Sequence, residues 1–163
     1  MPTTLEDVRE FLGQRRIALV GLSRDPKDFT RLLFHEMRQR GYDMVPVNPA
    51  AGELENQRCF ARVQDIEPPP EGALIMTAPR ETERVVRDCA EAGVHQVWMH
   101  RGGGQGAVSK EAADFCRRNG MHLVEGYCPF MFLPTTPFFH RLHGFILKVL
   151  GRYPCGAGSA KAA

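Results

Sequence analysis

Small, hydroxyl-bearing and basic residues follow an apolar run near the start of this sequence, and their types suit the binding of a phosphate. Gly21, Ser23 and Arg24 come directly after the run at residues 17–20, and Arg31 lies in the first turn of the helical pattern that follows. Glycine lets a backbone approach a ligand closely, and serine and arginine donate hydrogen bonds. In a strand–turn–helix unit, this turn lies near a helix N-terminus whose unpaired backbone N–H groups favour an anion. Residues 16–31 are therefore expected to begin a nucleotide or cofactor site.

Similar residues follow the other strands that the sequence predicts. In a parallel sheet the carboxyl ends of the strands share one edge, where ligands bind near the point at which the strand order reverses. Strand ends also need turn-forming residues without any ligand, which is the competing interpretation. The predicted ligand-binding residues are Gly21, Ser23, Arg24, Arg31, Asn48, Pro49, Thr77, Ala78, Pro79 and Cys128.

The elements that must position these residues alternate along the chain. Short apolar runs predict strands, and three- and four-residue spacing of apolar residues predicts helices. Strands are expected at 16–20, 42–47, 73–77, 95–100 and 121–125, and helices at 3–13, 29–40, 81–92, 109–119 and 136–150. Residues 50–70 are expected to be irregular, with one short pairing at 59–61, and Pro46 marks an edge or the end of a strand. The fold class is α/β, a Rossmann-like three-layer sandwich with a five-stranded, mainly parallel sheet.

The length of 163 residues fits one domain with an addition at its C-terminal side. We expect a Rossmann-like domain at 1–130 that begins with the helix at 3–13. An extension at 131–153 carries an amphipathic helix, which either packs on the domain or forms a homodimer interface. A role at a membrane surface is the alternative for this helix, because its polar side is basic. Residues 154–163 are rich in glycine and alanine and are expected to be disordered.

Composition excludes several classes of protein. A hydrophobic fraction of 43%, a charged fraction of 25% and a net charge of +2 are ordinary for a globular domain and do not favour nucleic-acid binding. No apolar run is long enough to span a bilayer, and the acidic N-terminus lacks an apolar signal core, so a cytoplasmic protein is expected. The five cysteines form no C-x-x-C pair and are expected to be free thiols.

Motifs for redox, metal and nucleophilic chemistry are incomplete. A dinucleotide fingerprint would need glycine where Ser23 and Pro26 stand, and Asn48 occupies the place of the acid that binds a ribose. His140 and His143 are three residues apart on one predicted helix, but no third metal ligand stands nearby. No Ser-His-Asp arrangement is present. We therefore predict no metal ion and no catalytic residue, and NAD(P) remains an alternative ligand.

Four segments together resemble the small CoA-binding domain family. They are residues 20–26 (Val-Gly-Leu-Ser-Arg-Asp-Pro), 41–49 (Gly-Tyr-Asp-Met-Val-Pro-Val-Asn-Pro), 97–99 (Val-Trp-Met) and 128–129 (Cys-Pro). The resemblance covers roughly residues 14 to 130, and Val-Pro-Val-Asn-Pro is its most specific part. The family fold is similar to the N-terminal domain of the succinyl-CoA synthetase α subunit, whose second domain with a phosphohistidine this chain is too short to supply.

The resemblance implies a coenzyme A site. Gly21, Ser23 and Arg24 would lie near the phosphates, and the residues after the second and third strands would line the ligand. Cys128 would either meet the thiol arm of CoA or be a buried structural cysteine. The main hypothesis is a protein that binds CoA or acyl-CoA without catalysis. The alternatives are an NAD(P)- or nucleotide-binding redox enzyme or sensor, and the CoA-binding subunit of an acyl-CoA ligase-like complex.

Overall fold

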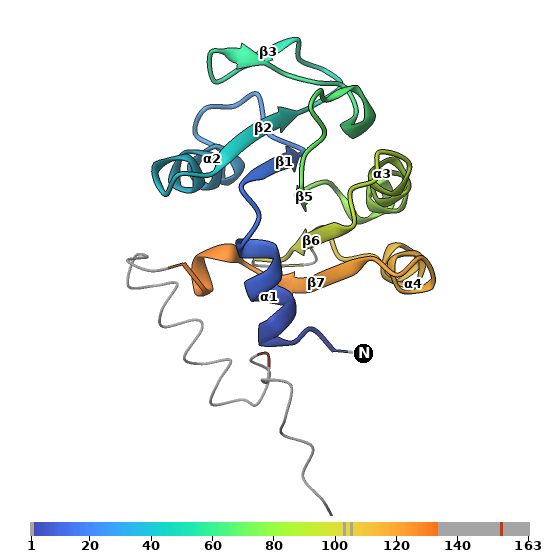
Figure 1. Cartoon of the computed structure of the whole chain (residues 1–163). Coiled ribbons are helices and arrows are strands. Elements are labelled where there is room, and N and C mark those ends of the chain that lie inside the picture. The colour runs from blue at the N-terminus through green and yellow to red at the C-terminus, as the bar shows by residue number, and fades with distance from the viewer. Residues whose placement is uncertain (1, 103, 105, 134–153, 155–163) are drawn as a thin grey trace, which may run out of the picture.

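The computed structural model of the chain describes residues 2–102, 104, 106–133 and 154 (Figure 1). The predicted helix at 136–150, His140, His143 and most of the predicted tail lie outside the described residues. The division into a domain at 1–130, an extension and a tail therefore stays a prediction. Within the described part of the chain, no helix is both long enough and apolar enough to cross a membrane.

A five-stranded sheet forms the centre of the fold, and all its paired strands are parallel. The strand order is β2-β1-β5-β6-β7. Runs of buried, mostly apolar residues make all of these strands except β7, in which only Val124 is buried, as expected for a sheet covered on both faces with β7 at its edge. Their bounds are β1 (Arg16–Val20), β2 (Asp43–Val47), β5 (Gly72–Ile75), β6 (Gln96–His100) and β7 (His122–Tyr127).

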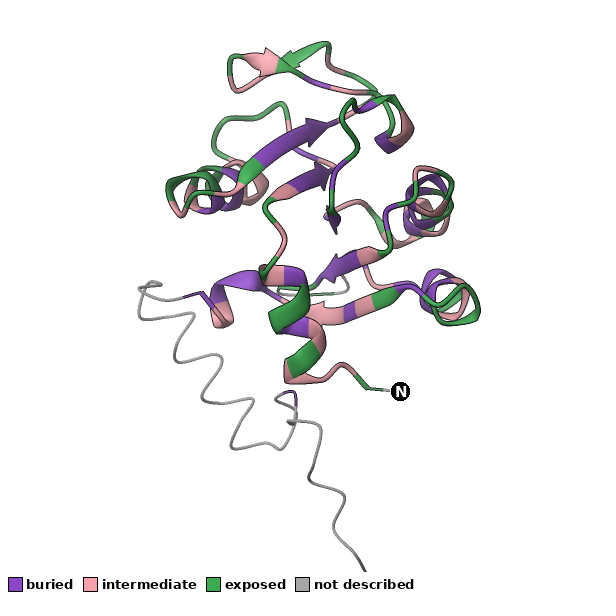
Figure 2. Ribbon diagram, in the orientation of Figure 1, coloured by how far each residue is buried: buried purple, intermediate pink, exposed green. Residues whose placement is uncertain are grey.

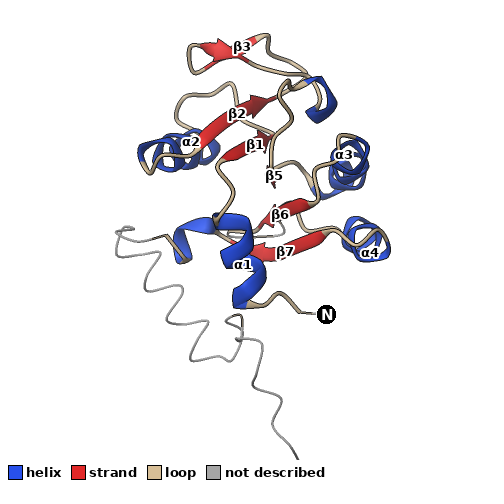
Figure 3. Cartoon of the chain, viewed as in Figure 1, coloured by secondary structure: helices blue, strands red, loops and turns tan. Residues whose placement is uncertain are grey.

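Helices cover both faces of the sheet, which confirms the predicted three-layer α/β fold (Figures 1 and 3). One face carries α1 (Leu5–Leu12) and α2 (Phe29–Gln39), and the other carries α3 (Pro79–Glu91) and α4 (Lys110–Arg118). Figure 2 shows β1, β2, β5 and β6 mostly buried between the layers, β7 at the edge of the sheet mostly of intermediate burial, and the outer helix surfaces exposed. The fold therefore has two hydrophobic cores, one on each face of the sheet.

Side chains at the helix N-termini account for where three of the helices begin. Thr4 and Asp7 form a capping box at the start of α1. Asp28 caps α2, and Ser109 caps α4. The third helix begins at Pro79, two residues before the predicted start, because proline at the first helical position needs no N–H partner.

Residues 50–70 contain more structure than the sequence predicted. A two-stranded hairpin, β3 (Glu53–Leu54) and β4 (Gln57–Arg58), lies beyond β2, and the 3₁₀ helix η1 (Val63–Asp65) follows it. The predicted pairing near residue 60 is confirmed by a parallel bridge from Val47 to Phe60. The Phe60 N–H donates to the Pro46 carbonyl at 3.0 Å, so this segment partly covers the edge that Pro46 marks.

Candidate functional site

The strand order reverses between β1 and β5, and three of the predicted loops meet there. The chain leaves β1, adds β2 on one side and returns to add β5 on the other. The Gly21 N–H donates to the Val47 carbonyl at 2.9 Å, and the Met76 N–H donates to the Val20 carbonyl at 2.8 Å. The carboxyl ends of β1, β2 and β5 are thus joined at the switch point, where ligands bind in doubly wound sheets.

Gly21 suits this place because its backbone conformation and its surroundings both disfavour a side chain. Its φ of +95° lies in the left-handed region, and a Cβ atom there would lie 3.1 Å from the Met76 carbonyl carbon and oxygen and from Thr77 Cγ2. The turn after β1 therefore sits against the end of β5 with little room for a side chain.

Ser23 lies in the first loop (residues 21–28) and is held by three hydrogen bonds. Its N–H donates to Thr30 Oγ1 at 2.9 Å, and its carbonyl accepts from Arg31 Nη1 at 3.1 Å. Its hydroxyl accepts from the Asp25 N–H at 3.1 Å. A hydroxyl that accepts in this way still carries its own hydrogen. Ser23 can therefore donate one hydrogen bond to a ligand oxygen from a fixed position.

The N-terminus of α2 differs from the prediction, which placed unpaired N–H groups beside the first loop. Asp28 Oδ1 accepts from the Thr30 N–H at 2.8 Å and from the Thr30 hydroxyl at 2.6 Å. Its carboxylate thus takes the position of an anion at this helix end. The prediction was wrong here because an aspartate directly before a helical pattern is itself a capping signal. A phosphate at the first loop would have to use other donors.

Charge in the first loop is balanced. Arg24 and Lys27 are exposed, and Asp25 and Asp28 stand in the same loop and offset the two cations. Attraction to a phosphate would therefore come from directed donors rather than from net charge. Long basic side chains at exposed positions can turn toward such a ligand.

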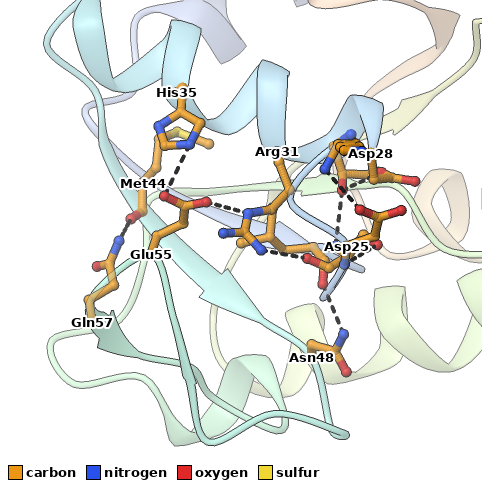
Figure 4. A network of polar contacts seen from close by, with 12 residues as sticks. Asp25, Asp28, Arg31, His35, Met44, Asn48, Glu55 and Gln57 are labelled. Atoms are coloured by element: carbon orange, nitrogen blue, oxygen red, sulfur yellow. Dashed lines mark hydrogen bonds and ion pairs between the residues drawn. The ribbon is translucent and has the colours of Figure 1, made fainter.

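Arg31 lies near the first loop, as predicted, but its charge is already paired. Its Nε forms a salt bridge with Glu55 in the turn of the β3–β4 hairpin (Figure 4). Both side chains are nearly buried, with exposed fractions of 12% and 8%. Glu55 was not predicted from the sequence because the turn Glu55-Asn56 carries no glycine, which is the usual signal of a two-residue hairpin.

Asn48 and Pro49 follow β2, and Asn48 connects its loop to the first loop. Asn48 Nδ2 donates to the Leu22 carbonyl at 2.8 Å, and its Oδ1 accepts from the Ala50 N–H at 2.8 Å. Pro49 is exposed beside it. These contacts explain in structural terms why an asparagine occupies position 48. Its contact with a ligand stays a prediction.

The residues after β5 lie next to Gly21 and lead into α3. Thr77 Oγ1 is 3.3 Å from Thr82 Oγ1, which donates to the Ala107 carbonyl at 2.8 Å. Ala78 is the N-cap residue of α3, and its side chain makes no capping hydrogen bond to this helix. The first N–H groups of a helix carry partial positive charge. Residues 77–79 therefore bring the N-terminus of a 13-residue helix to the switch point.

Cys128 follows β7 and lies apart from the other predicted ligand residues. Strand β7 is three positions from β1 in the sheet, or about 14 Å at the usual strand spacing. The Cys128 side chain is buried in the core beneath α1 and α2. Burial raises the pKa of its thiol to about 11, although a backbone hydrogen bond from Phe130 opposes the rise. This environment favours a structural cysteine over a reactive thiolate.

Cys128 is expected to react slowly with iodoacetamide at pH 7.4. A pKa of about 11 in place of 9.0 lowers the thiolate fraction about a hundredfold, and burial blocks the reagent as well. Site-resolved mass spectrometry should find Cys128 almost unmodified after a time that labels it fully in 6 M guanidinium, which serves as the control condition. Labelling of the native protein at the rate of a free cysteine would instead support a reactive role.

The model of the CoA binding domain family matches residues 15–134. The chain belongs to this family. The match covers all five strands of the sheet and the loops at the switch point, and it confirms the resemblance drawn from the four sequence segments.

Relatives of this CoA-binding domain include both short proteins and parts of longer ones. The chain is 24% identical to the uncharacterized protein YneT of Bacillus subtilis, over 75% of this chain and 88% of that protein. It is 25% identical to the alpha subunit of an ADP-forming acetate–CoA ligase of Pyrococcus furiosus, over 72% of this chain but only 27% of the subunit. A hypothetical protein from Pyrococcus horikoshii has a similar structure, with a TM-score of 0.72, 27% identity, and coverage of 90% of this chain and 96% of that one.

Proposed function

We propose that this protein binds coenzyme A or an acyl-CoA at the carboxyl ends of β1, β2 and β5, and that it has no catalytic activity of its own. The family match supports the ligand. The location of the proposed site is supported by the Gly21 turn, which lies against the end of β5 at the switch point and inside the matched segment. A pyrophosphate suits this edge because the Ser23 hydroxyl and the N-terminus of α3 both lie there.

All the predicted residues except Cys128 have a part in this proposal. The Ser23 hydroxyl and the Arg24 guanidinium contact the pyrophosphate, and Gly21 lets the ligand approach the backbone. Residues 48–49 and 77–79 line the ligand on either side of the first loop, and the N-terminus of α3, which Ala78 does not cap, adds partial positive charge. Arg31 acts through the protein, since Glu55 already pairs its charge.

The lack of catalysis is proposed from the chemistry of the same residues. Apart from Cys128, the proposed ligand residues include no side chain that exchanges a proton near neutral pH, and burial raises the pKa of Cys128 to about 11. General acid–base catalysis needs a group with a pKa near the working pH. This set of residues is therefore suited to binding rather than to proton transfer.

Isothermal titration calorimetry with CoA, acetyl-CoA, NAD and ATP, each in a separate titration, tests the ligand. We expect saturable binding of CoA or acetyl-CoA to the wild type, and a loss of at least about a hundredfold in affinity for Ser23→Asp. An aspartate can accept from the Asp25 N–H as the serine does, so the loop keeps its turn. The new carboxylate then repels the pyrophosphate at short range.

Ser23→Ala is the matched control, because it removes the hydroxyl without adding charge. Loss of one hydrogen bond of about 1 kcal/mol predicts an affinity about fivefold lower. Equal CoA affinity in the wild type and Ser23→Asp would show that the first loop is not part of the binding site. Binding of NAD with no heat from CoA would replace this proposal with the redox alternative.

A second candidate function is that of a CoA-binding subunit in an acyl-CoA ligase-like complex. The similarity to the alpha subunit of the acetate–CoA ligase favours it, although the chain spans only 27% of that subunit. Co-purification of the tagged protein with an ATP-grasp subunit from its own cell would support this function. Recovery of the protein without such a subunit, under conditions that retain CoA, would favour the separate binding protein.

A further inference from the structure

The β3–β4 hairpin contains a buried acid in an unusual backbone conformation. Glu55 and Asn56 have φ values of +58° and +57°, and such left-handed conformations are uncommon outside glycine. The Glu55 side chain is 8% exposed, whereas glutamate is almost never buried unless it is paired. A two-residue hairpin turn requires the positive φ values, and the burial of the side chain indicates that the carboxylate has fixed partners.

Contacts on two sides hold Glu55 over α2 (Figure 4). Its Oε1 pairs with Arg31 Nε, and its Oε2 lies 3.1 Å from His35 Nε2, one helical turn further along α2. Gln57 Nε2 donates to the Met44 carbonyl at 3.3 Å and fixes the hairpin to the edge strand. The carboxylate is therefore held in a fixed position beside the first two turns of α2.

Arg31 connects Glu55 to the first loop. While its Nε faces Glu55, its Nη1 donates to the Ser23 carbonyl at 3.1 Å. The guanidinium is planar and rigid, so fixing one of its nitrogens fixes the direction of the others. Since the Ser23 N–H is held by Thr30, Arg31 completes the restraint of both backbone groups of this residue.

We propose that Glu55 is a positioning residue for the ligand site: it orients Arg31, which holds the Ser23 carbonyl and so keeps the first loop in its binding conformation. Arg31 acts on the loop backbone and not on a phosphate, because its charge is balanced by Glu55. This inference rests on the proposed binding of CoA at the first loop. It assigns a role in that site to a hairpin residue that lies 24 positions beyond Arg31 in the sequence.

Glu55→Gln tests the proposal, with hydrogen–deuterium exchange of the unliganded protein as the first readout. Glutamine keeps the size of the side chain but removes the charge that orients Arg31. We expect peptides from residues 21–28 to exchange about tenfold faster, while peptides from β1, β5 and β6 keep the wild-type rate. In the calorimetric titration, we expect the Kd for CoA to rise about tenfold, as for a lost hydrogen bond to a charged group.

Two further variants sharpen the test. Glu53→Gln changes an exposed acid of the same hairpin and should leave both readouts at wild-type values. Arg31→Lys keeps the charge but cannot contact Glu55 and Ser23 as a rigid fork, so it should reproduce the effects of Glu55→Gln. In the double variant the two effects should not add, because both changes break one connection.

The outcomes separate this inference from the proposed function. Unchanged exchange of the first loop in Glu55→Gln would overturn the positioning role, and so would faster exchange throughout the sheet, which indicates a general loss of stability. Tighter CoA binding by Glu55→Gln would also overturn it, since Arg31 would then act directly on a phosphate. If the wild type binds no CoA, the proposed function fails, while faster exchange confined to the first loop still supports the connection from Glu55.

Discussion

Replacing Gly21 with valine is expected to lower the free energy of unfolding by roughly 3 to 5 kcal/mol and to abolish CoA binding. Valine must adopt a φ of +95°, which is strained for a β-branched residue. Its Cβ would also lie 3.1 Å from the Met76 backbone, which cannot turn aside as a flexible side chain would. Relief of this contact moves the first loop away from the end of β5. Urea unfolding followed by circular dichroism measures the stability, and calorimetry measures the binding.

Gly41→Val is the matched control for Gly21→Val. Gly41 has a φ of +91°, but no atom lies within 4 Å of a Cβ built there. The Gly41→Val variant therefore measures the backbone strain alone. We expect it to lower the free energy of unfolding by about 1 to 3 kcal/mol and to leave the CoA affinity unchanged. Equal destabilisation by the two variants would show that the contact with Met76 costs nothing, and close packing would then not explain the glycine at position 21.

Replacing Trp98 with alanine is expected to destabilise the protein by about 3 to 5 kcal/mol. Trp98 in β6 is fully buried, and its ring packs edge-to-face on Phe11 at 5.2 Å between centroids. Its Nε1 donates to the Tyr127 carbonyl at 2.8 Å. Alanine leaves a cavity between the sheet and α1 and removes this hydrogen bond. Because Trp98 is the single tryptophan of the chain, unfolding must be followed by circular dichroism rather than by tryptophan fluorescence.

Trp98→Phe separates the two contributions. Phenylalanine retains most of the aromatic packing and loses the hydrogen bond, so a smaller effect of about 1 to 2 kcal/mol is expected. The variant should bind CoA as the wild type does, because Trp98 contributes to the core beneath α1 and not to the switch point. A Trp98→Ala variant as stable as the wild type would contradict the burial of this ring.

Local pattern accounts for most of the predicted fold. The strand at 16–20 matches β1, and the predicted helix at 29–40 ends one residue beyond α2, since buried apolar runs and helical spacing are properties of neighbouring residues. Boundaries were wrong where the adjoining turn decides them. The third helix begins at Pro79 and not at residue 81, and the strand at 73–77 corresponds to Gly72–Ile75. Thr77 therefore lies in the loop and not in the strand.

The candidate site was predictable in its location but not in its contacts. Parallel strands place their carboxyl ends together, so Gly21, Asn48 and Thr77 were expected at one edge, and the structure brings their loops together. Their hydrogen bonds were not predictable. The Asn48 amide contacts the Leu22 carbonyl across 26 residues of sequence, and the Glu55 carboxylate reaches Arg31 across 24.

The sequence by itself determined the alternation of strands and helices, the glycine turn after β1 and the segments by which the family is identified. The tertiary structure alone decided the strand order, the contact of Asn48 with the first loop and the pairing of Arg31 with Glu55. The physical reason is the range of the interactions. Periodicity and turn preferences act between neighbours, whereas the partner of a buried charge depends on which distant segment folding brings beside it.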